Sequence, residues 1–148
     1  MYTIGQVSEM FNIPISTLRY YDNEGFFPNM QRHSGIRDFS ENEIAALRIV
    51  ECLKSSGLEI KEIKQFMEMT TRGAETYEDR LKLFEARRDA VENEICKLQR
   101  TLDMLKYKCW YYEQAIKDGN EDNINAMLPD KLPPKIQKLY DNGSKNAV

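Results

Sequence analysis

The sequence predicts a mainly α-helical fold, in which a winged helix-turn-helix domain is followed by a long coiled-coil helix. Two short helical patterns with a tight turn between them open the chain, and a short hairpin pattern built around a glycine follows. A heptad repeat of apolar residues then fills much of the second half. We therefore expect a winged domain at residues 1–72, a coiled-coil helix at 75–118 and a short C-terminal tail at 119–148.

The first two helices are predicted from signals at their ends. Thr3 and Gln6 have the spacing of a capping box, in which the side chain of each residue accepts a hydrogen bond from the backbone amide of the other. Asn12 tolerates the left-handed backbone that ends a helix, and Pro14 permits a new start. A second helix is expected from Ile15 to Asn23. Two short helices joined by a tight turn are typical of a helix-turn-helix.

A small hairpin and two further helices complete the expected domain. Residues 33–35, with the sequence HSG, lie between two short runs and have the composition of a hairpin turn. Ser40 and Glu43 form a second capping box, which starts a helix that runs to Ser56. A fourth helix is expected over Ile60–Thr70. These elements, in this order, describe a winged helix-turn-helix domain.

The second half of the chain carries a heptad seam. Apolar residues recur at alternating spacings of three and four, with Arg88 and Cys109 as its less apolar members: Leu81, Phe84, Val91, Ile95, Leu98, Leu102, Leu105, Tyr112 and Ile116. A helix from Tyr77 to Lys117 would be roughly 60 Å long, further than the neighbouring domain can cover. Such a helix needs a partner, so we predict that these residues mediate dimerisation.

The C-terminal region, residues 119–148, is rich in Asn, Asp and Pro. This composition predicts mostly loop, with one short helix after Pro133 and Pro134 and a frayed end.

Composition limits the classes of function. The chain has 148 residues, 30% of them charged, and no apolar run as long as a membrane span or a signal peptide, so we expect a cytoplasmic protein that does not contact membranes. Its net charge of −3 argues against general electrostatic attraction to nucleic acid. Any contact with nucleic acid must therefore be local and directional.

No catalytic or metal-binding constellation is visible. The three cysteines lie far apart without a C-x-x-C pair, and the single histidine has no neighbouring ligand in the sequence. No nucleophile, base and orienting group can be placed together, and no phosphate loop is present. We expect neither an enzyme nor a bound metal or cofactor.

The second helix carries side chains suited to DNA. The Arg19 guanidinium can donate two parallel hydrogen bonds to a phosphate or to a guanine edge. The alternative is that Arg19 is a solvated surface residue. Tyr20 and Tyr21 follow it. Tyr21 falls on the apolar face, so its ring is expected to pack inward while its hydroxyl reaches the surface. Ser16 and Thr17 are suited to base edges or phosphates, or serve simply as first-turn residues.

The predicted hairpin gathers basic side chains around a glycine. Arg32, His33 and Arg37 flank Gly35 on an exposed wing. Such side chains can follow a DNA backbone or enter a minor groove. The alternative is a solvent-exposed loop that needs charge only for solubility.

These motifs together resemble a known family. The segments "RYYDNEGF" and "RHSGIRDF", within residues 3–63, closely resemble the recognition helix and wing of MerR-type transcription regulators. The long helix resembles the antiparallel dimerisation coiled coil of that family. The resemblance implies a homodimer that binds double-stranded promoter DNA at a two-fold site with a long spacer. On effector binding, such dimers distort the promoter so that the RNA polymerase holoenzyme can engage it.

The resemblance assigns DNA contacts to specific residues and also shows two departures. The contact positions of the family fall on Arg19, Tyr20 and Tyr21 in the helix and on Arg32 and Arg37 in the wing. Pro14 and Ile15 replace a capping serine at the start of the recognition helix, and Ile36 replaces a tyrosine of the wing.

The effector is less defined by the sequence. In the family that the chain resembles, metal sensors carry a cysteine pair just after the long helix and drug sensors carry a large C-terminal domain. This chain has no such cysteine pair, and about thirty residues after the helix cannot form such a domain, so the resemblance disfavours both classes of effector. The segment "RIVECLKSSG" is similar to a small thiol-sensing group, which makes Cys52 a candidate sensor of electrophiles with Arg48 as its nearby cation. The alternative is that Cys52 is a small buried apolar residue. Cys109 and Trp110 are further candidates.

An aromatic cluster near the end of the long helix can form a ligand wall or, as we expect, pack against the DNA-binding domain of the partner: Tyr107, Trp110, Tyr111 and Tyr112. A rival function for the whole chain is a coiled-coil adaptor without sequence-specific DNA binding. That rival leaves the arginines of the second helix and the wing unexplained.

Overall fold

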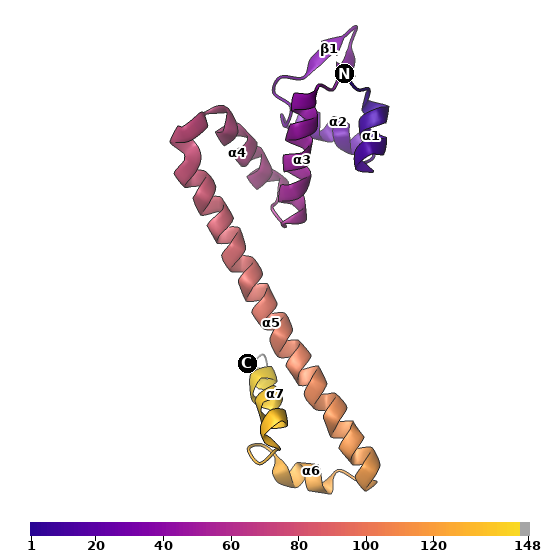
Figure 1. Ribbon diagram of the computed structural model, residues 1–148, viewed down its shortest axis with the longest axis vertical. Helices are drawn as coiled ribbons and strands as arrows, with labels where there is room; N and C mark the ends of the chain where they lie inside the picture. The colour runs from indigo at the N-terminus through magenta and orange to yellow at the C-terminus, as the bar shows by residue number, and fades with distance from the viewer. Residues whose placement is uncertain (146–148) are drawn as a thin grey trace. The chain divides into compact units, whose positions relative to one another are not determined.

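The computed structural model describes residues 1–145 and divides within its longest helix into two compact units, Met1–Arg87 and the residues from Arg88 onward. The elements of the chain are shown in Figure 1: α1 (Ile4–Phe11), α2 (Ile15–Asn23), β1 (Gln31–His33), β2 (Ile36–Asp38), α3 (Glu41–Ser55), α4 (Ile60–Thr71), the 3-10 turn η1 (Gly73–Thr76), α5 (Tyr77–Asp118), α6 (Asp122–Met127) and α7 (Pro134–Ser144). The mainly helical fold with a two-stranded wing and one long helix is therefore confirmed. Within this part of the chain, no helix has both the length and the apolar content needed to span a membrane.

The predicted helix ends in the first unit are confirmed. The Thr3 hydroxyl accepts the Gln6 amide at 3.3 Å, and the Gln6 side chain accepts the Thr3 amide at 2.8 Å. Asn12 adopts the left-handed conformation with φ of 54°. The second capping box also forms, since the Ser40 amide donates to the Glu43 carboxylate at 2.9 Å. Local sequence alone therefore starts α1 and α3 and ends α1.

One apolar core holds the first unit together. Its most deeply buried members come from the four helices α1 to α4 and from the segments after α2 and after β2: Val7, Leu18, Tyr21, Phe26, Phe39, Ile44, Leu47, Val50 and Ile63. An isolated antiparallel bridge between Tyr2 and Phe39, with N–O distances of 2.8 and 3.0 Å, ties the N-terminus to the base of the wing. The helix-turn-helix and the wing therefore share one core.

The wing is a tight antiparallel hairpin. Gln31 pairs with Asp38, Arg32 with Arg37 and His33 with Ile36. The two residues between the strands have positive φ, 50° at Ser34 and 80° at Gly35, as a type I′ turn requires.

The second unit confirms the short helix expected after Pro133 and Pro134 and corrects the expectation that the rest of the tail is loop. Residues after α5 form two helices, α6 and α7, and α7 runs back along α5 in the opposite direction. The Tyr140 ring lies 5.0 Å from that of Tyr107, and Asn142 Nδ2 donates to Asp103 Oδ2 at 2.6 Å. The predicted frayed end at residues 146–148 lies outside the described residues. We call α6 and α7 together the C-terminal cap.

The cap explains most of the aromatic cluster. Tyr107 and Tyr111 are buried together with Ile124 and Leu132, and Trp110 packs against the same group. The Tyr111 hydroxyl donates to Glu121 Oε1 at 2.9 Å, and this hydrogen bond together with burial raises the pKa of Tyr111. We expected these rings to pack against the DNA-binding domain of a partner chain. For Tyr107 and Tyr111 this expectation is wrong, since their own chain covers them.

Candidate nucleic-acid interface

Helix α2 buries one face and presents the other. Leu18 and Tyr21 belong to the core, whereas Arg19 is exposed and Tyr20 is 45% exposed. Ser16 is exposed and Thr17 is half-buried in the first turn. Pro14 occupies the cap position and offers no side-chain hydrogen bond, as the sequence predicted. The helix therefore directs one free guanidinium and one phenol ring outward from a firmly packed base.

Tyr21 anchors this helix to α3. Its ring is 1% exposed, and its hydroxyl donates to Glu51 Oε1 at 2.9 Å and accepts from Lys54 Nζ at 3.1 Å. Burial, followed by the hydrogen bond to Glu51, raises the pKa of Tyr21, although Lys54 opposes the shift. The hydroxyl therefore stays protonated near neutral pH and holds α2 in place, rather than standing free at the surface as the sequence suggested.

A single carboxylate joins the wing to α2. Asp22 Oδ2 accepts from Arg32 Nη2 and from Arg37 Nε, both at 2.7 Å, and the Asp22 side chain is only 7% exposed. Charge-assisted hydrogen bonds of this length are directional, so they fix the angle between the wing and the helix. Asp22 was missed by the reasoning from sequence, because it lies 10 and 15 residues from the two arginines and no local spacing links them.

The remaining wing residues are arranged around this clamp. The Arg32 side chain keeps 50% of its surface exposed, whereas that of Arg37 keeps 20%. His33 Nδ1 lies 2.8 Å from Asp38 Oδ2 across the hairpin, and the His33 side chain is 69% exposed. Gly35 supplies the turn. Among the basic side chains of the wing, Arg32 and His33 are therefore the most available to a ligand.

The candidate effector residues do not form one site. Cys52 is exposed on α3, so its alternative interpretation as a buried apolar residue is wrong. Cys109 is exposed on α5, whereas the half-buried Trp110 packs on the C-terminal cap. Across residues 1–145, no cluster of three His, Cys, Asp or Glu side chains is arranged to hold a metal ion.

Comparison with known families and sequences gives a consistent assignment. The family model for MerR helix-turn-helix regulatory proteins matches residues 2–70, and that described as MerR, DNA binding matches residues 44–107. An uncharacterized helix-turn-helix transcriptional regulator of Haemophilus influenzae is 39% identical over 125 residues, which span 84% of this chain and 93% of the relative. The regulator AdhR of Bacillus subtilis is 36% identical over 78 residues, or 52% of this chain and 56% of the relative.

Solved structures agree with the sequence matches. HiNmlR, described as a MerR family regulator lacking the sensor domain and bound to promoter DNA, superimposes with a TM-score of 0.63 at 39% identity and covers 82% of this chain and 98% of its own. A MerR family regulator from Bacillus thuringiensis gives a TM-score of 0.59 at 38% identity, and the match covers 73% of this chain and 96% of that regulator. With a full-length relative, two family models and the winged fold in agreement, this chain belongs to the MerR family of helix-turn-helix transcriptional regulators.

Proposed function

We propose that this chain forms a homodimer that binds a two-fold site in promoter DNA and regulates transcription there. Helix α2 enters the major groove, and the wing lies along the adjacent backbone or minor groove. HiNmlR is bound to promoter DNA, and nearly its whole length aligns with this chain. This relationship supports the proposal. On this proposal, the dimer and the RNA polymerase holoenzyme bind the same promoter DNA.

The observation that carries the DNA interface is the exposed face of α2 with the wing clamped beside it. Arg19 and Tyr20 point outward from a helix whose other face is buried, and Asp22 holds Arg32 and Arg37 next to them. Since the chain carries a net charge of −3, non-specific attraction to phosphate is weak. Arg19 therefore has a large share of the attraction to DNA, while Asp22 positions the wing.

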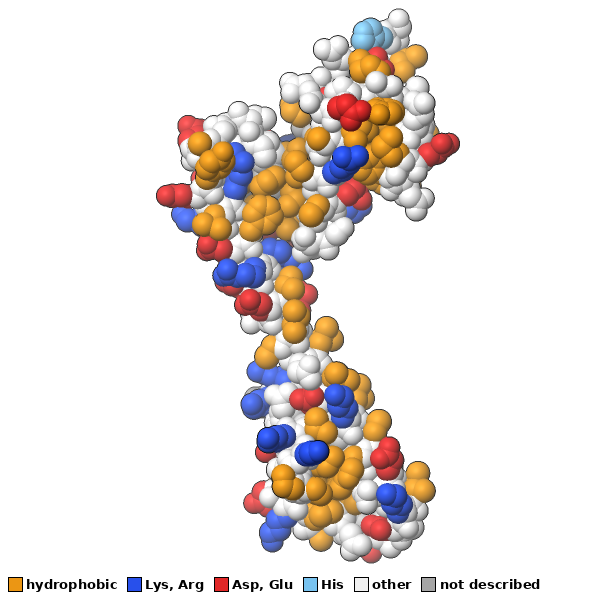
Figure 2. Space-filling model, in the orientation of Figure 1, with side chains coloured by type: hydrophobic (Ala, Val, Ile, Leu, Met, Phe, Trp, Pro, Cys, Tyr) orange, Lys and Arg blue, Asp and Glu red, His pale blue; other side chains and the backbone are white. Residues whose placement is uncertain are grey.

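The dimer interface is the seam of α5. Of its nine predicted members, all are exposed except the half-buried Val91, and apolar side chains remain visible along α5 in the space-filling view (Figure 2). The C-terminal cap covers Met104, Tyr107 and Tyr111, which occupy heptad positions on the side of α5 away from the seam. The cap thus buries one stripe of the helix and leaves the other for a second copy.

We further propose that a small effector, such as an electrophile, changes how the dimer holds the promoter. Exposed Cys52 and Cys109 are the candidate thiols, and both are accessible in the single chain. Cys52 follows Glu51, which binds the hydroxyl of Tyr21 on the DNA-reading helix. An adduct on Cys52 therefore forms next to a contact that positions α2.

Replacement of Arg19 by alanine is the direct test of the DNA interface. We expect binding to weaken by about 1–3 kcal/mol, roughly fivefold to 150-fold, and the slope of log affinity against log salt to fall by about one. The measurement is a fluorescence-anisotropy titration over a salt series, with a duplex recovered by in vitro selection with the full chain.

Lys64→Ala is the matched control, because it removes one exposed positive charge from α4, outside the proposed interface. It should change affinity by no more than the general electrostatic effect of one charge. If Arg19→Ala and Lys64→Ala weaken binding equally, α2 is not the DNA-reading helix.

Replacement of Cys52 by serine tests the effector proposal. Since Cys52 is exposed, the change leaves the core intact and DNA affinity unaltered. We expect the variant to lose the transcriptional response to a reactive aldehyde or quinone in an in vitro transcription assay with the selected promoter. A full response in Cys52→Ser combined with none in Cys109→Ser would move the sensor to α5, and a full response in both would mean a non-covalent effector.

A further inference from the structure

Two arginines of α5 reach back to the ends of two different helices of the first unit. Arg80 donates to the Met69 carbonyl in the last turn of α4 and to the Gly73 carbonyl just after it, and Arg87 donates to a carbonyl at the end of α3. We propose that this two-point attachment sets the direction in which α5 leaves the DNA-binding unit and thereby selects the spacing between the two half-sites of the DNA. The inference rests on the proposed function and names residues that determine its specificity.

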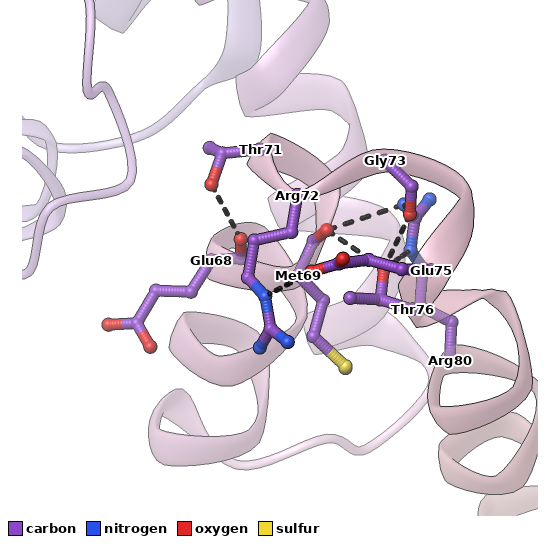
Figure 3. Close-up of polar contacts among 8 residues, drawn as sticks. All are labelled: Glu68, Met69, Thr71, Arg72, Gly73, Glu75, Thr76 and Arg80. Carbon is purple, nitrogen blue, oxygen red and sulfur yellow. Dashed lines mark hydrogen bonds and ion pairs between the residues drawn. The ribbon is translucent and has the colours of Figure 1, made fainter.

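The first attachment is a network around a buried threonine (Figure 3). Thr76 is fully buried, and its hydroxyl lies 2.9 Å from each of the carbonyl oxygens of Met69 and Gly73. Arg80 Nε donates to the Thr76 hydroxyl at 2.9 Å, and Arg80 Nη2 donates to the Gly73 carbonyl at 2.8 Å. Carbonyl groups at the end of a helix carry partial negative charge, so a guanidinium there is favourable. Arg80 therefore fastens the start of α5 to the end of α4.

The second attachment lies at the end of α3. Arg87 Nε donates to the Ser56 carbonyl at 2.5 Å. The guanidinium rests over Gly57, where a Cβ atom would lie 2.3 Å from Arg87 Nη2 and 2.7 Å from its Cζ. Gly57 has φ of 85°, which favours glycine and closes α3. The same glycine therefore ends the helix and makes room for the arginine.

The spacing of the two arginines makes the attachment directional. Arg80 and Arg87 are seven residues apart, so they lie two turns apart on the same side of α5. Apolar contacts are also present here, such as the Phe66 and Phe84 rings 5.4 Å apart, but apolar contacts are not directional. Because charge-assisted hydrogen bonds hold α5 at two positions along its axis, they set the orientation of the start of α5 relative to α3 and α4.

The aim of α5 matters because a dimer joins two DNA-reading units through this helix. Each inserted base pair moves one half-site by about 3.4 Å and rotates it by about 34°. A rigid attachment accepts one spacing, whereas a loose attachment lets each unit follow its own half-site. Arg80 and Arg87 are thus positioning residues that act on DNA through the direction of α5.

The test compares the unsubstituted chain with Arg80→Ala/Arg87→Ala on two kinds of duplex. One kind carries the full selected site with its spacer changed by −2 to +2 base pairs, and the other carries a single half-site. We expect the unsubstituted chain to lose about tenfold or more in affinity when the spacer changes, in the range of measured couplings between sites. The double variant should keep its half-site affinity and vary less than about threefold across the spacer series.

Arg72→Ala is the matched control, because this arginine lies in the same bend but pairs with Glu75 at the surface, where both side chains are more than 60% exposed. It should keep the full spacing preference. Gly57→Ala displaces the Arg87 guanidinium without removing a charge, and it should broaden the preference even where the double variant is too unstable to assay. Gly119→Ala, with φ of 74° and open space around it, controls for backbone strain alone.

A retained spacing preference in both Arg80→Ala/Arg87→Ala and Gly57→Ala overturns the inference while leaving DNA binding intact. Failure of the unsubstituted chain to bind either duplex overturns the proposed function itself, and the inference falls with it. Equal loss of affinity on half-site and full-site duplexes would show that the arginines only stabilise the domain, which also overturns the inference.

Discussion

We expect Leu98→Asp to convert the proposed dimer to monomer. Leu98 lies at the middle of the α5 seam and is 69% exposed in the single chain, although it is a large apolar side chain. In a two-helix interface the substitution buries one uncompensated carboxylate from each chain, at roughly 3–5 kcal/mol per charge. Dimerisation should therefore weaken by at least about 100-fold, since each 1.4 kcal/mol is a factor of ten.

Sedimentation equilibrium over a micromolar concentration series measures this effect. Cys96→Asp is the matched control, because Cys96 is exposed two residues earlier and falls on the side of the heptad away from the seam. That variant should remain dimeric, and helix content by circular dichroism should be the same in both. A dimeric Leu98→Asp variant would mean that the seam is not the interface.

Gly143→Leu detaches α7 from α5. Gly143 is a buried glycine inside α7, and a Cβ atom there would lie 2.7 Å from the Met104 Cβ and 2.9 Å from the Met104 backbone. Because the obstacle includes helix backbone, it cannot move aside, and overpacking of this kind costs about 1–3 kcal/mol. Leucine is a better helix former than glycine, so the loss reports the clash and not helix propensity.

Trp110 is a built-in probe for this change, since it is the single tryptophan and packs half-buried against the cap with its ring 6.4 Å from that of Tyr107. We expect the Trp110 fluorescence emission to shift to longer wavelength. The midpoint of urea unfolding, followed by this fluorescence, should fall. Lys138→Leu, at an exposed position of α7, serves as control and should leave both unchanged. An unaltered midpoint in Gly143→Leu would show that α7 does not pack tightly through this residue.

Much of the first unit was predictable because its signals are local. Capping boxes at Thr3 and Ser40 act over three residues, and a turn glycine such as Gly35 acts through its own backbone. The exposed apolar seam of α5 was also readable, since helical periodicity places every third and fourth residue on one stripe.

In the C-terminal cap, the sequence predicted the helix after Pro133 and Pro134, but it did not predict α6 or the packing of both helices on α5. The two short helices of the cap have weak intrinsic signals, and isolated helices of that length are marginal in water. They exist because Tyr107 and Tyr111 bury their rings against them and because Gly143 permits a close approach to Met104. The Asn- and Pro-rich composition pointed to loop, but tertiary packing overrode that preference.

By itself, the sequence determined the order of the elements, the ends of α1 and α3, the turn of the wing and the exposed arginine of α2. Only the tertiary structure decided which charged groups meet. Asp22 joins Arg32 and Arg37 from 10 and 15 residues away, and Arg87 reaches Ser56 across 31 residues. Such pairs have no periodicity or fixed spacing, because a long side chain finds its partner only after packing has brought the two backbones together. The local signals therefore determine which elements form, and the packing determines how the proposed DNA interface is held.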